Sequence, residues 1–252
     1  MNDRSKTADW YADHVLADVE LFAGVLERGP LDAAVAACPG WDVARLAVHL
    51  GTIHRWARHN VIHASPPEDT SAFKPERGLD GAGLAAWLRA GAAELVDTLR
   101  TLDPEAPTWH PFLVAKVAGV WPRRQAHETV IHRWDAERAV GSPSPIDAEL
   151  ASDGIDEYFE LGVSRKVTRE QLEYPTGSLH VHCTDVEGEW FVWADDEGYH
   201  VERIHQKGDA ALRGPAEALL LRLWGRTSEG ADELSPIGDE SVLESWLSIA
   251  GL

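Results

Sequence analysis

Near residue 141 the pattern of residue types along the sequence changes, and this change limits the folds that the chain can adopt. Before it, long segments rich in Ala, Leu, Arg and Glu alternate with breaks that contain Pro and Gly, as helices do. After it, short runs alternate apolar and polar residues, as half-buried strands do. The chain therefore predicts an α+β protein with two domains, 1–141 and 146–252, joined by the linker GSPSPID.

The first predicted domain carries four amphipathic helices, expected at roughly 8–27, 42–62, 79–102 and 122–140. Asp42 is a good N-cap for the second of these, and Pro122 is acceptable in the first turn of the fourth. Four such helices with connections of varied length predict a four-helix bundle.

The second predicted domain begins with one helix over 146–167. Three alternating runs then predict a meander of antiparallel strands, and a short fourth strand and two helices follow. The expected strands are 179–183, 190–193, 199–204 and 210–212, and the expected helices are 215–224 and 240–249. We therefore expect a smaller α+β domain with an antiparallel sheet.

The charge balance excludes two classes of partner. Acidic residues outnumber basic ones 42 to 23, which gives a formal charge of −19. Such a chain repels phosphate backbones and anionic lipid, so we expect no nucleic acid and no membrane partner. No apolar stretch approaches 18 residues, and the first residues, MNDRSKTADWYADH, lack the apolar core of a signal peptide. We expect a cytoplasmic protein.

Two cysteines, Cys38 and Cys183, are too few for a disulfide framework or a multi-cysteine zinc site. We expect both to be small buried thiols. Cys38 precedes the second helix and could lie near a site on it, but the chemistry inferred below needs neither cysteine as a nucleophile.

The predicted fourth helix contains the run His127-Glu128-Thr129-Val130-Ile131-His132. It invites comparison with zinc proteases, whose two histidines are four residues apart. Here they are five apart, which separates them by about 140° around a helix, so they cannot share one ion. Glu128 and His132, however, are four apart and face the same point.

The predicted second helix offers a third ligand. Its inward stripe contains His49 among Leu46, Leu50 and Ile53. An imidazole on an apolar face needs a partner, and a cation shared with Glu128 and His132 would supply one. Two histidines and a carboxylate match catalytic zinc sites, although iron and nickel accept similar ligands. A hydrogen-bonded core histidine and an ordinary surface Glu/His pair remain the alternative interpretation.

For the other histidines we expect solvated or structural roles and no comparable convergence. We place two of them, His54 and His59, toward the flank of the second helix. The full set is His14, His54, His59, His63, His110, His127, His180, His182, His200 and His205.

Three separated runs of sequence carry a family resemblance. They are CPGWDVARLAVHL at 38–50, WPRRQAHETVIHRWDAE at 121–137 and GDAALRGPAEALLLRLWGR at 208–226. All three resemble the mycothiol-dependent maleylpyruvate isomerase family, across nearly the whole chain. The resemblance implies a DinB-like metal-binding four-helix bundle followed by a sterol-carrier-like α+β domain.

Carried over residue by residue, the family's metal ligands fall on His49, Glu128 and His132, the positions that helical spacing also selects. The resemblance implies Zn²⁺ or another divalent metal, with mycothiol or a similar thiol as cosubstrate. It also implies a catalytic arginine in the C-terminal domain, for which Arg226 is the best match and Arg222 the rival. Either arginine could instead cap a helix or pair with acids. Asp135 could accept a hydrogen bond behind the metal ligands, or pair with an arginine of its own helix.

The chemistry of such a site favours a thiol. A dication held by two neutral imidazoles and one carboxylate keeps a charge of about +1, which favours an anion, and thiolate is a soft ligand suited to zinc. Addition of a thiol to a cis double bond allows rotation, and elimination then gives the trans product. Addition without elimination is S-transfer.

The predicted function is therefore that of a metal-dependent transferase or isomerase that uses a thiol on a small electrophile. A protein that only binds or senses a metal or small ligand is one alternative. A hydrolase that uses metal-bound water is another. The expected partners are a small-molecule substrate and the thiol, and the chain is expected to be a monomer or a homodimer.

Overall fold

The computed structural model describes residues 6–141, 143–227 and 229–249. Residues 1–5 and 250–252 of the predicted domains, and position 142 in the predicted linker, lie outside the described residues. The chain divides into two compact units, one of residues up to 144 without 111–114, and one of 111–114 and the residues from 145 onward. Each unit is described by itself.

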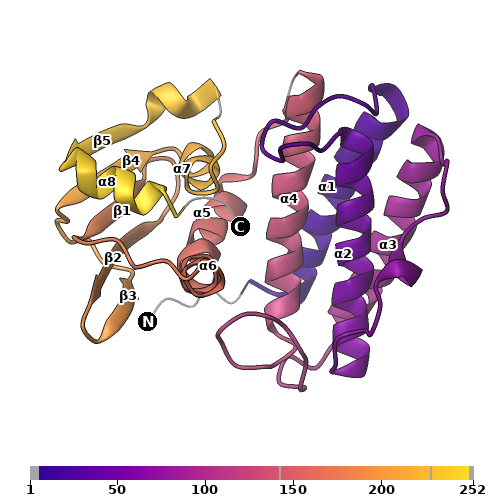
Figure 1. Cartoon of the computed structure of the whole chain (residues 1–252), viewed down its shortest axis with the longest axis horizontal. Coiled ribbons are helices and arrows are strands. Elements are labelled where there is room, and N and C mark those ends of the chain that lie inside the picture. Colours follow the sequence, from indigo (N-terminus) through magenta and orange to yellow (C-terminus); the bar gives the residue numbers. More distant parts are fainter. Residues whose placement is uncertain (1–5, 142, 228, 250–252) are drawn as a thin grey trace. The chain divides into compact units, whose positions relative to one another are not determined.

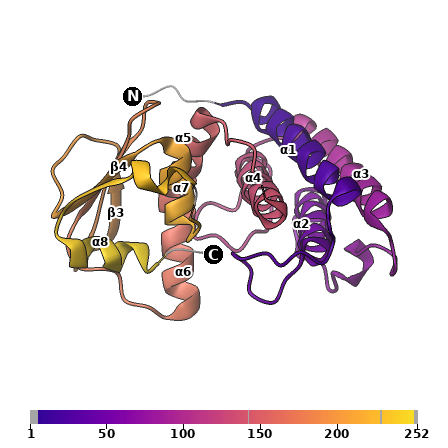
Figure 2. The ribbon, with the colours of Figure 1, turned by 90° about the horizontal axis from the view of Figure 1, so that it is seen from above.

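The first unit is a four-helix bundle, as predicted. Its helices are α1 (Ala8–Arg28), α2 (Val43–His63), α3 (Gly81–Thr101) and α4 (Val120–Val140), shown in indigo to magenta in Figure 1. Both α1 and α2 pack against α3 and against α4, so each helix has two neighbours (Figure 2). A 3-10 turn at Ser71–Phe73 lies in the connection between α2 and α3.

Side-chain caps fix where three of these helices begin. Asp42 accepts a hydrogen bond from the backbone N–H of Arg45 at 2.7 Å, which confirms it as the N-cap of α2. Thr7 and Asp80 cap α1 and α3 in the same way. Helix α4 starts after Gly119 without a side-chain cap.

Helices α2 and α3 approach closely at a glycine. A Cβ atom at Gly51 would lie 2.2 Å from the ring of Trp87, so any larger residue there would force the ring to move. Arg55, one turn further along α2, lies over the same ring at 4.2 Å and donates to the Trp87 carbonyl at 2.8 Å. This contact holds the Gly51–Arg55 turn of α2 close against α3.

A buried ion-pair network joins α1 to α4. Arg133 donates to Asp18 on α1 and to Glu137 on its own helix, both at 2.9 Å, and its side chain is 2% exposed. Glu137 also accepts hydrogen bonds from the N–H and hydroxyl of Ser144. Each charge is thus compensated in a site that excludes water.

The second unit begins with α5 (Ala148–Glu157) and α6 (Val163–Glu170), joined by the π-helical turn Tyr158–Gly162. One helix was expected over 146–167. The helical run is continuous there, but the backbone N–H of Val163 bonds to the carbonyl of Tyr158, which widens one turn.

The sheet has the order β3-β2-β1-β4-β5. Its strands are β1 (Leu179–Cys183), β2 (Glu189–Asp195), β3 (Gly198–Glu202), β4 (Ala210–Gly214) and β5 (Ser235–Gly238). The predicted meander of β1, β2 and β3 is confirmed. The expectation of a wholly antiparallel sheet is corrected, because β4 pairs with β1 in parallel, so the sheet is mixed. Two parallel strands need a long connection, and here β2, β3 and the segment after them connect the end of β1 to the start of β4.

The two faces of the sheet differ in chemistry. Leu179, Val181, Trp190 and Val192 are buried on one face. The opposite face carries His180 and His182 of β1 and Glu189 of β2, because side chains alternate along each strand.

The remaining helices, α7 (Ala216–Leu223) and α8 (Glu240–Leu247), confirm the predicted ones to within a few residues, and a 3-10 turn at Glu229–Glu233 lies between them. Across the described residues, every helix is too short or too polar to pass through a lipid bilayer.

Candidate metal centre

His49 lies in the middle of α2, on the side that faces α4. Its side chain is 30% exposed, and its ring packs edge-on against Trp41, with the ring centroids 5.0 Å apart. The same stripe of α2 buries Leu46 and Leu50 completely. The helix therefore presents one imidazole at the margin of an apolar contact, whereas the sequence predicted this residue inside the inward stripe.

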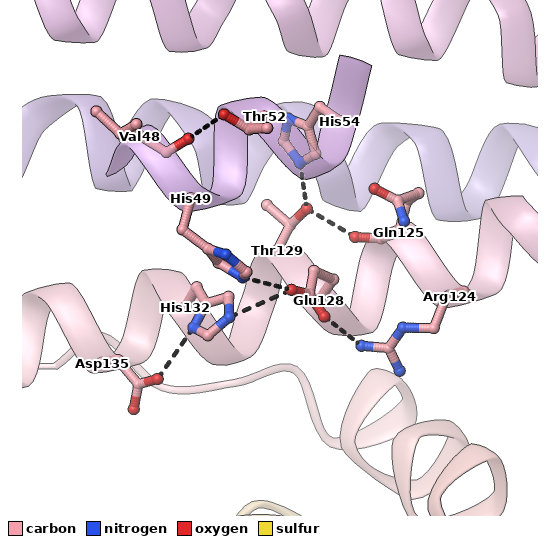
Figure 3. Close-up of polar contacts among 10 residues, drawn as sticks. All are labelled: Val48, His49, Thr52, His54, Arg124, Gln125, Glu128, Thr129, His132 and Asp135. Atoms are coloured by element: carbon pink, nitrogen blue, oxygen red, sulfur yellow. Dashed lines mark hydrogen bonds and ion pairs between the residues drawn. The ribbon is translucent and has the colours of Figure 1, made fainter. Parts of the chain in front are cut away.

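Glu128 and His132 project from α4 toward His49 (Figure 3). Nε2 of His49 lies 3.2 Å from Oε1 of Glu128, and Nε2 of His132 lies 3.3 Å from the same oxygen. The two imidazole rings are perpendicular, with centroids 5.1 Å apart. The structure thus brings together the three residues that helical spacing selected.

These three residues are close enough together to share one divalent cation. Bonds of roughly 2 Å at tetrahedral angles place neighbouring ligand atoms roughly 3.3 Å apart. One ligand atom from each of His49, Glu128 and His132 lies within 4.8 Å of the others, and two of the three separations already match that spacing. The donor set of two nitrogens and one oxygen suits zinc and related cations.

The other oxygen of Glu128 is used differently. Oε2 accepts a hydrogen bond from Arg124, one turn earlier on α4, at 2.8 Å. Burial alone would raise the pKa of Glu128, but hydrogen bonds from His132 and His49 hold this pKa well below its usual value. Glu128 is therefore a carboxylate whose Oε1 faces both histidines and whose Oε2 is bound by Arg124.

Asp135 orients His132 from behind. Its side chain is fully buried, and its Oδ2 lies 3.2 Å from Nδ1 of His132. Burial would lower the pKa of His132, but the hydrogen bonds to Asp135 and Glu128 outweigh it and raise this pKa to about 9. A hydrogen bond at Nδ1 leaves Nε2 pointing at the cluster, which is how carboxylates commonly orient metal-binding histidines.

Two other histidines test the predicted helix faces: His54 does not lie where it was expected, and His127 does. His54 was expected on the flank of α2, but it is completely buried, and its Nε2 lies 2.9 Å from the hydroxyl of Thr129. That hydroxyl donates its own proton to the Gln125 carbonyl, so Nε2 of His54 is the donor. His127 is buried with its ring against Tyr11 of α1, so it faces away from His132, as the spacing required.

Cys38 lies nearer to these residues than its weak sequence signal suggested. It is half-buried rather than buried, and its sulfur lies within 4.8 Å of ligand atoms on His132 and Asp135. Cys183 is buried, as expected. Proximity to His132 could not be derived from the sequence, because Cys38 lies in the loop before α2.

The two candidate arginines belong to the second unit. Arg226 follows α7 and donates to the backbone carbonyl of Trp224 at 2.7 Å. Arg222 lies on α7 and pairs with Glu244 of α8 at 3.6 Å. Both side chains are half-buried.

The fold and this cluster define a class of protein, a helical bundle with two histidines and a carboxylate that is followed by an α+β domain. Comparison with known families identifies the chain more closely. Residues 12–137 match the family described as "Mycothiol maleylpyruvate isomerase N-terminal domain", and residues 149–245 match its C-terminal domain. The chain therefore belongs to the mycothiol maleylpyruvate isomerase family, as the sequence resemblance predicted.

Solved structures agree with this assignment at the level of the fold. A crystal structure of the mycothiol-dependent maleylpyruvate isomerase aligns with a TM-score of 0.58, and a histidine-to-alanine variant of that enzyme aligns with a TM-score of 0.57. Each alignment has 13% identity and covers 91% of this chain and 92% of the other. No curated protein sequence is significantly similar to this chain. Family membership confirms the predicted class, an isomerase-type enzyme that uses mycothiol.

Proposed function

We propose that the chain is a divalent-metal enzyme that uses mycothiol, or a closely related thiol, either to isomerise a small electrophile of the maleylpyruvate type or to convert it into an S-conjugate by S-transfer. The observation that carries the proposal is the meeting of Nε2 of His49 and Nε2 of His132 at one oxygen of Glu128, at 3.2 and 3.3 Å. A bound cation would hold an incoming thiol as the thiolate near neutral pH.

The protein's own residues have separate roles in this proposal. His49, Glu128 and His132 hold the cation, and Asp135 orients His132. Arg124 keeps the second oxygen of Glu128 engaged. Arg226 is proposed to bind a carboxylate of the substrate, since a guanidinium can form two parallel hydrogen bonds with such a group.

The reaction is the reversible addition of a thiol to a double bond. The S–H group adds across the cis double bond, so that one carbon gains the sulfur and the other gains the proton. Rotation about the resulting single bond and loss of the same thiol give the trans isomer. If the thiol is retained, the product is an S-conjugate.

The first test is metal content. After loading with Zn²⁺, full-length His49→Ala should hold one equivalent less than the unsubstituted protein. His63→Ala should hold the same amount as the unsubstituted protein, because His63 is an exposed histidine at the end of the same helix. Thermal shift with mycothiol should then show stabilisation that requires the His49-dependent metal.

The second test follows the reaction. Maleylpyruvate incubated with protein and mycothiol should convert to the trans isomer or to a thiol conjugate, and Arg226→Ala should slow this more than Arg222→Ala. Metal binding without any response to thiol would instead identify a sensor. Thiol-independent cleavage of an ester or amide panel would identify a hydrolase.

A further inference from the structure

Three imidazoles and a carboxylate gather on the face of the sheet opposite Leu179 and Val181 in the second unit. His180 and His182 are two residues apart on β1, so their side chains share a face, and Glu189 on β2 lies directly opposite His182. His205 comes from the segment after β3. One ligand atom from each of the four lies within 4.8 Å of the others. The expectation of no convergence among these histidines was wrong.

Glu189 is the centre of this group. Its Oε1 lies 2.7 Å from Nδ1 of His205 and is also in hydrogen-bond contact with Nδ1 of His182. The rings of His180 and His205 meet edge-on with centroids 5.2 Å apart. Nitrogens from two segments far apart in sequence therefore converge on one oxygen, which is the pattern seen at His49, Glu128 and His132.

His180 provides an independent observation. Its side chain is buried, with 9% of its surface exposed, and within the described part of the chain no group forms a hydrogen bond with its Nε2. A buried polar atom without a partner is costly, so such atoms in native proteins call for an explanation such as an ion.

We propose that His180, His182, Glu189 and His205 form a second divalent-cation site, distinct from the one in the helical bundle. Three imidazole nitrogens and one carboxylate oxygen are a complete tetrahedral set for zinc. Because all four ligands come from the protein, the site is of the structural kind and would tie the segment after β3 to β1 and β2.

The charge states of these residues suit a cation. Burial would raise the pKa of Glu189, but the hydrogen bonds from His205 and His182 lower it below its usual value, so the group is a carboxylate. Burial lowers the pKa of His180, which keeps this imidazole neutral and able to donate a lone pair. Arg213, the register neighbour of His182 on β4, is exposed, so solvent screens its charge.

The site is accessible and can contract. His180 and His205 line a cleft of about 450 Å³ next to Lys207 and Asp209, which lets an ion enter. Zinc requires ligand atoms roughly 3.3 Å apart. The side chain of His205 is 77% exposed, so it can move by the ångström or so that this requires without disturbing the core.

The test separates the two sites by using His49→Ala as the starting protein. Full-length His49→Ala is stripped with a chelator and titrated with Zn²⁺ against a competing indicator, and with Co²⁺, whose visible absorption reports tetrahedral coordination. We expect one tight equivalent and a tetrahedral Co²⁺ spectrum. Adding His205→Ala, on the exposed segment, should weaken zinc binding at least tenfold and abolish the spectrum.

His200→Ala is the matched control, because His200 is a half-buried histidine on β3, on the same face of the sheet, that pairs with Asp195 and lies outside the cluster. It should leave zinc affinity unchanged. His182→Ala provides a second variant with a half-buried side chain, and it should behave like His205→Ala. The proposal is overturned if His49→Ala binds no tight zinc, or if His200→Ala weakens binding as much as His205→Ala. Neither result would affect the proposed bundle site, which is tested in protein with this face intact.

Discussion

The carboxylate of Asp135 is fully buried and lies 3.2 Å from Nδ1 of His132. This contact leaves Nε2 of His132 directed at Glu128, so the orientation of a candidate ligand depends on a residue that is not itself a ligand.

The first prediction concerns this contact. Asp135→Asn should lower zinc affinity in the bundle site by about 10- to 100-fold when it is measured above about pH 9, where His132 carries no competing proton, because an amide does not fix the ring as a carboxylate does. The measurement is indicator competition in protein whose sheet-face histidine His205 is replaced by Ala, so that only the bundle site is counted. An unchanged affinity would show that Asp135 does not act through His132.

The second prediction is the pH dependence of metal uptake. The pKa of His132 is about 9 in the metal-free protein, so the ring carries a proton at pH 7 that the metal must displace. Zinc affinity should therefore rise about tenfold per pH unit between pH 6.5 and 8.5 and level off above about 9. Asp135→Asn should show a shallower slope, because it removes one of the contacts that raise this pKa. A slope that is the same in both proteins would contradict this assignment.

The third prediction concerns acid stability and His54. Burial is the largest cause that lowers the pKa of His54, to about 3, whereas the group titrates near 6.5 in an unfolded chain. Between these values the unfolded state binds the extra proton, so stability is lost as pH falls below 6.5. The loss is up to about 1.4 kcal/mol per pH unit, or about 2 kcal/mol at pH 5.

Urea unfolding of metal-free protein at pH 7 and pH 5 measures this loss. His54→Gln cannot titrate, so its free energy of unfolding should change less between the two pH values, whatever its stability at pH 7. Equal changes in the two proteins would mean that His54 is not the group responsible.

The fourth prediction tests the ion-pair network between α1 and α4. Arg133→Ala leaves Asp18 and Glu137 as buried charges and should cost about 3–5 kcal/mol in the free energy of unfolding. The matched control is Arg89→Ala, because Arg89 also bridges two carboxylates, Glu20 and Glu27, but lies at the surface. It should cost no more than about 1 kcal/mol. Similar losses in the free energy of unfolding for the two variants would show that burial does not determine how much Arg133 stabilises the fold.

The fifth prediction addresses the thiol near His132. Cys38→Ser should retain zinc in the bundle site and should retain turnover, because the three proposed ligands are His49, Glu128 and His132. Co²⁺-loaded protein checks this directly, since a cysteine ligand would add sulfur-to-cobalt charge-transfer absorption that the serine variant lacks. Loss of such a band on substitution would place Cys38 among the ligands.

The sequence predicted the helical bundle and the direction of its candidate ligands, because both follow from local spacing. Asp42 marks the start of α2, and residues four apart on α4 share a face whatever lies opposite. His49 was selected by the same rule. Its partnership with Glu128 needed only that α2 and α4 be neighbours.

His54 was misplaced because α2 packs against two helices, α3 and α4, and buries a wider arc than a single stripe. The mixed sheet was missed for a different reason. Alternation along β4 reveals which residues are buried, but it does not reveal the direction in which the strand pairs with β1. Strand β5, with the sequence SPIG, is four residues long and exposed at every position, so it has no alternation of buried and exposed residues to detect.

The sheet-face histidines were missed because their meeting depends on register. His182 and Glu189 are seven residues apart along the chain, and only the β1–β2 pairing places them opposite each other. His205 then joins them from a segment without regular structure.

The hydrogen bond between Arg124 and Glu128 changes the electrostatic balance of the bundle site. Because Oε2 of Glu128 is engaged by a guanidinium, this carboxylate can ligate through one oxygen only, which leaves more of the coordination sphere open to exchangeable ligands. The guanidinium also adds a positive charge directly behind the ligands. The buried carboxylate of Asp135 behind His132 offsets this charge, so a loaded centre would still carry about one uncompensated positive charge and should accept a monoanion such as a thiolate in its open position.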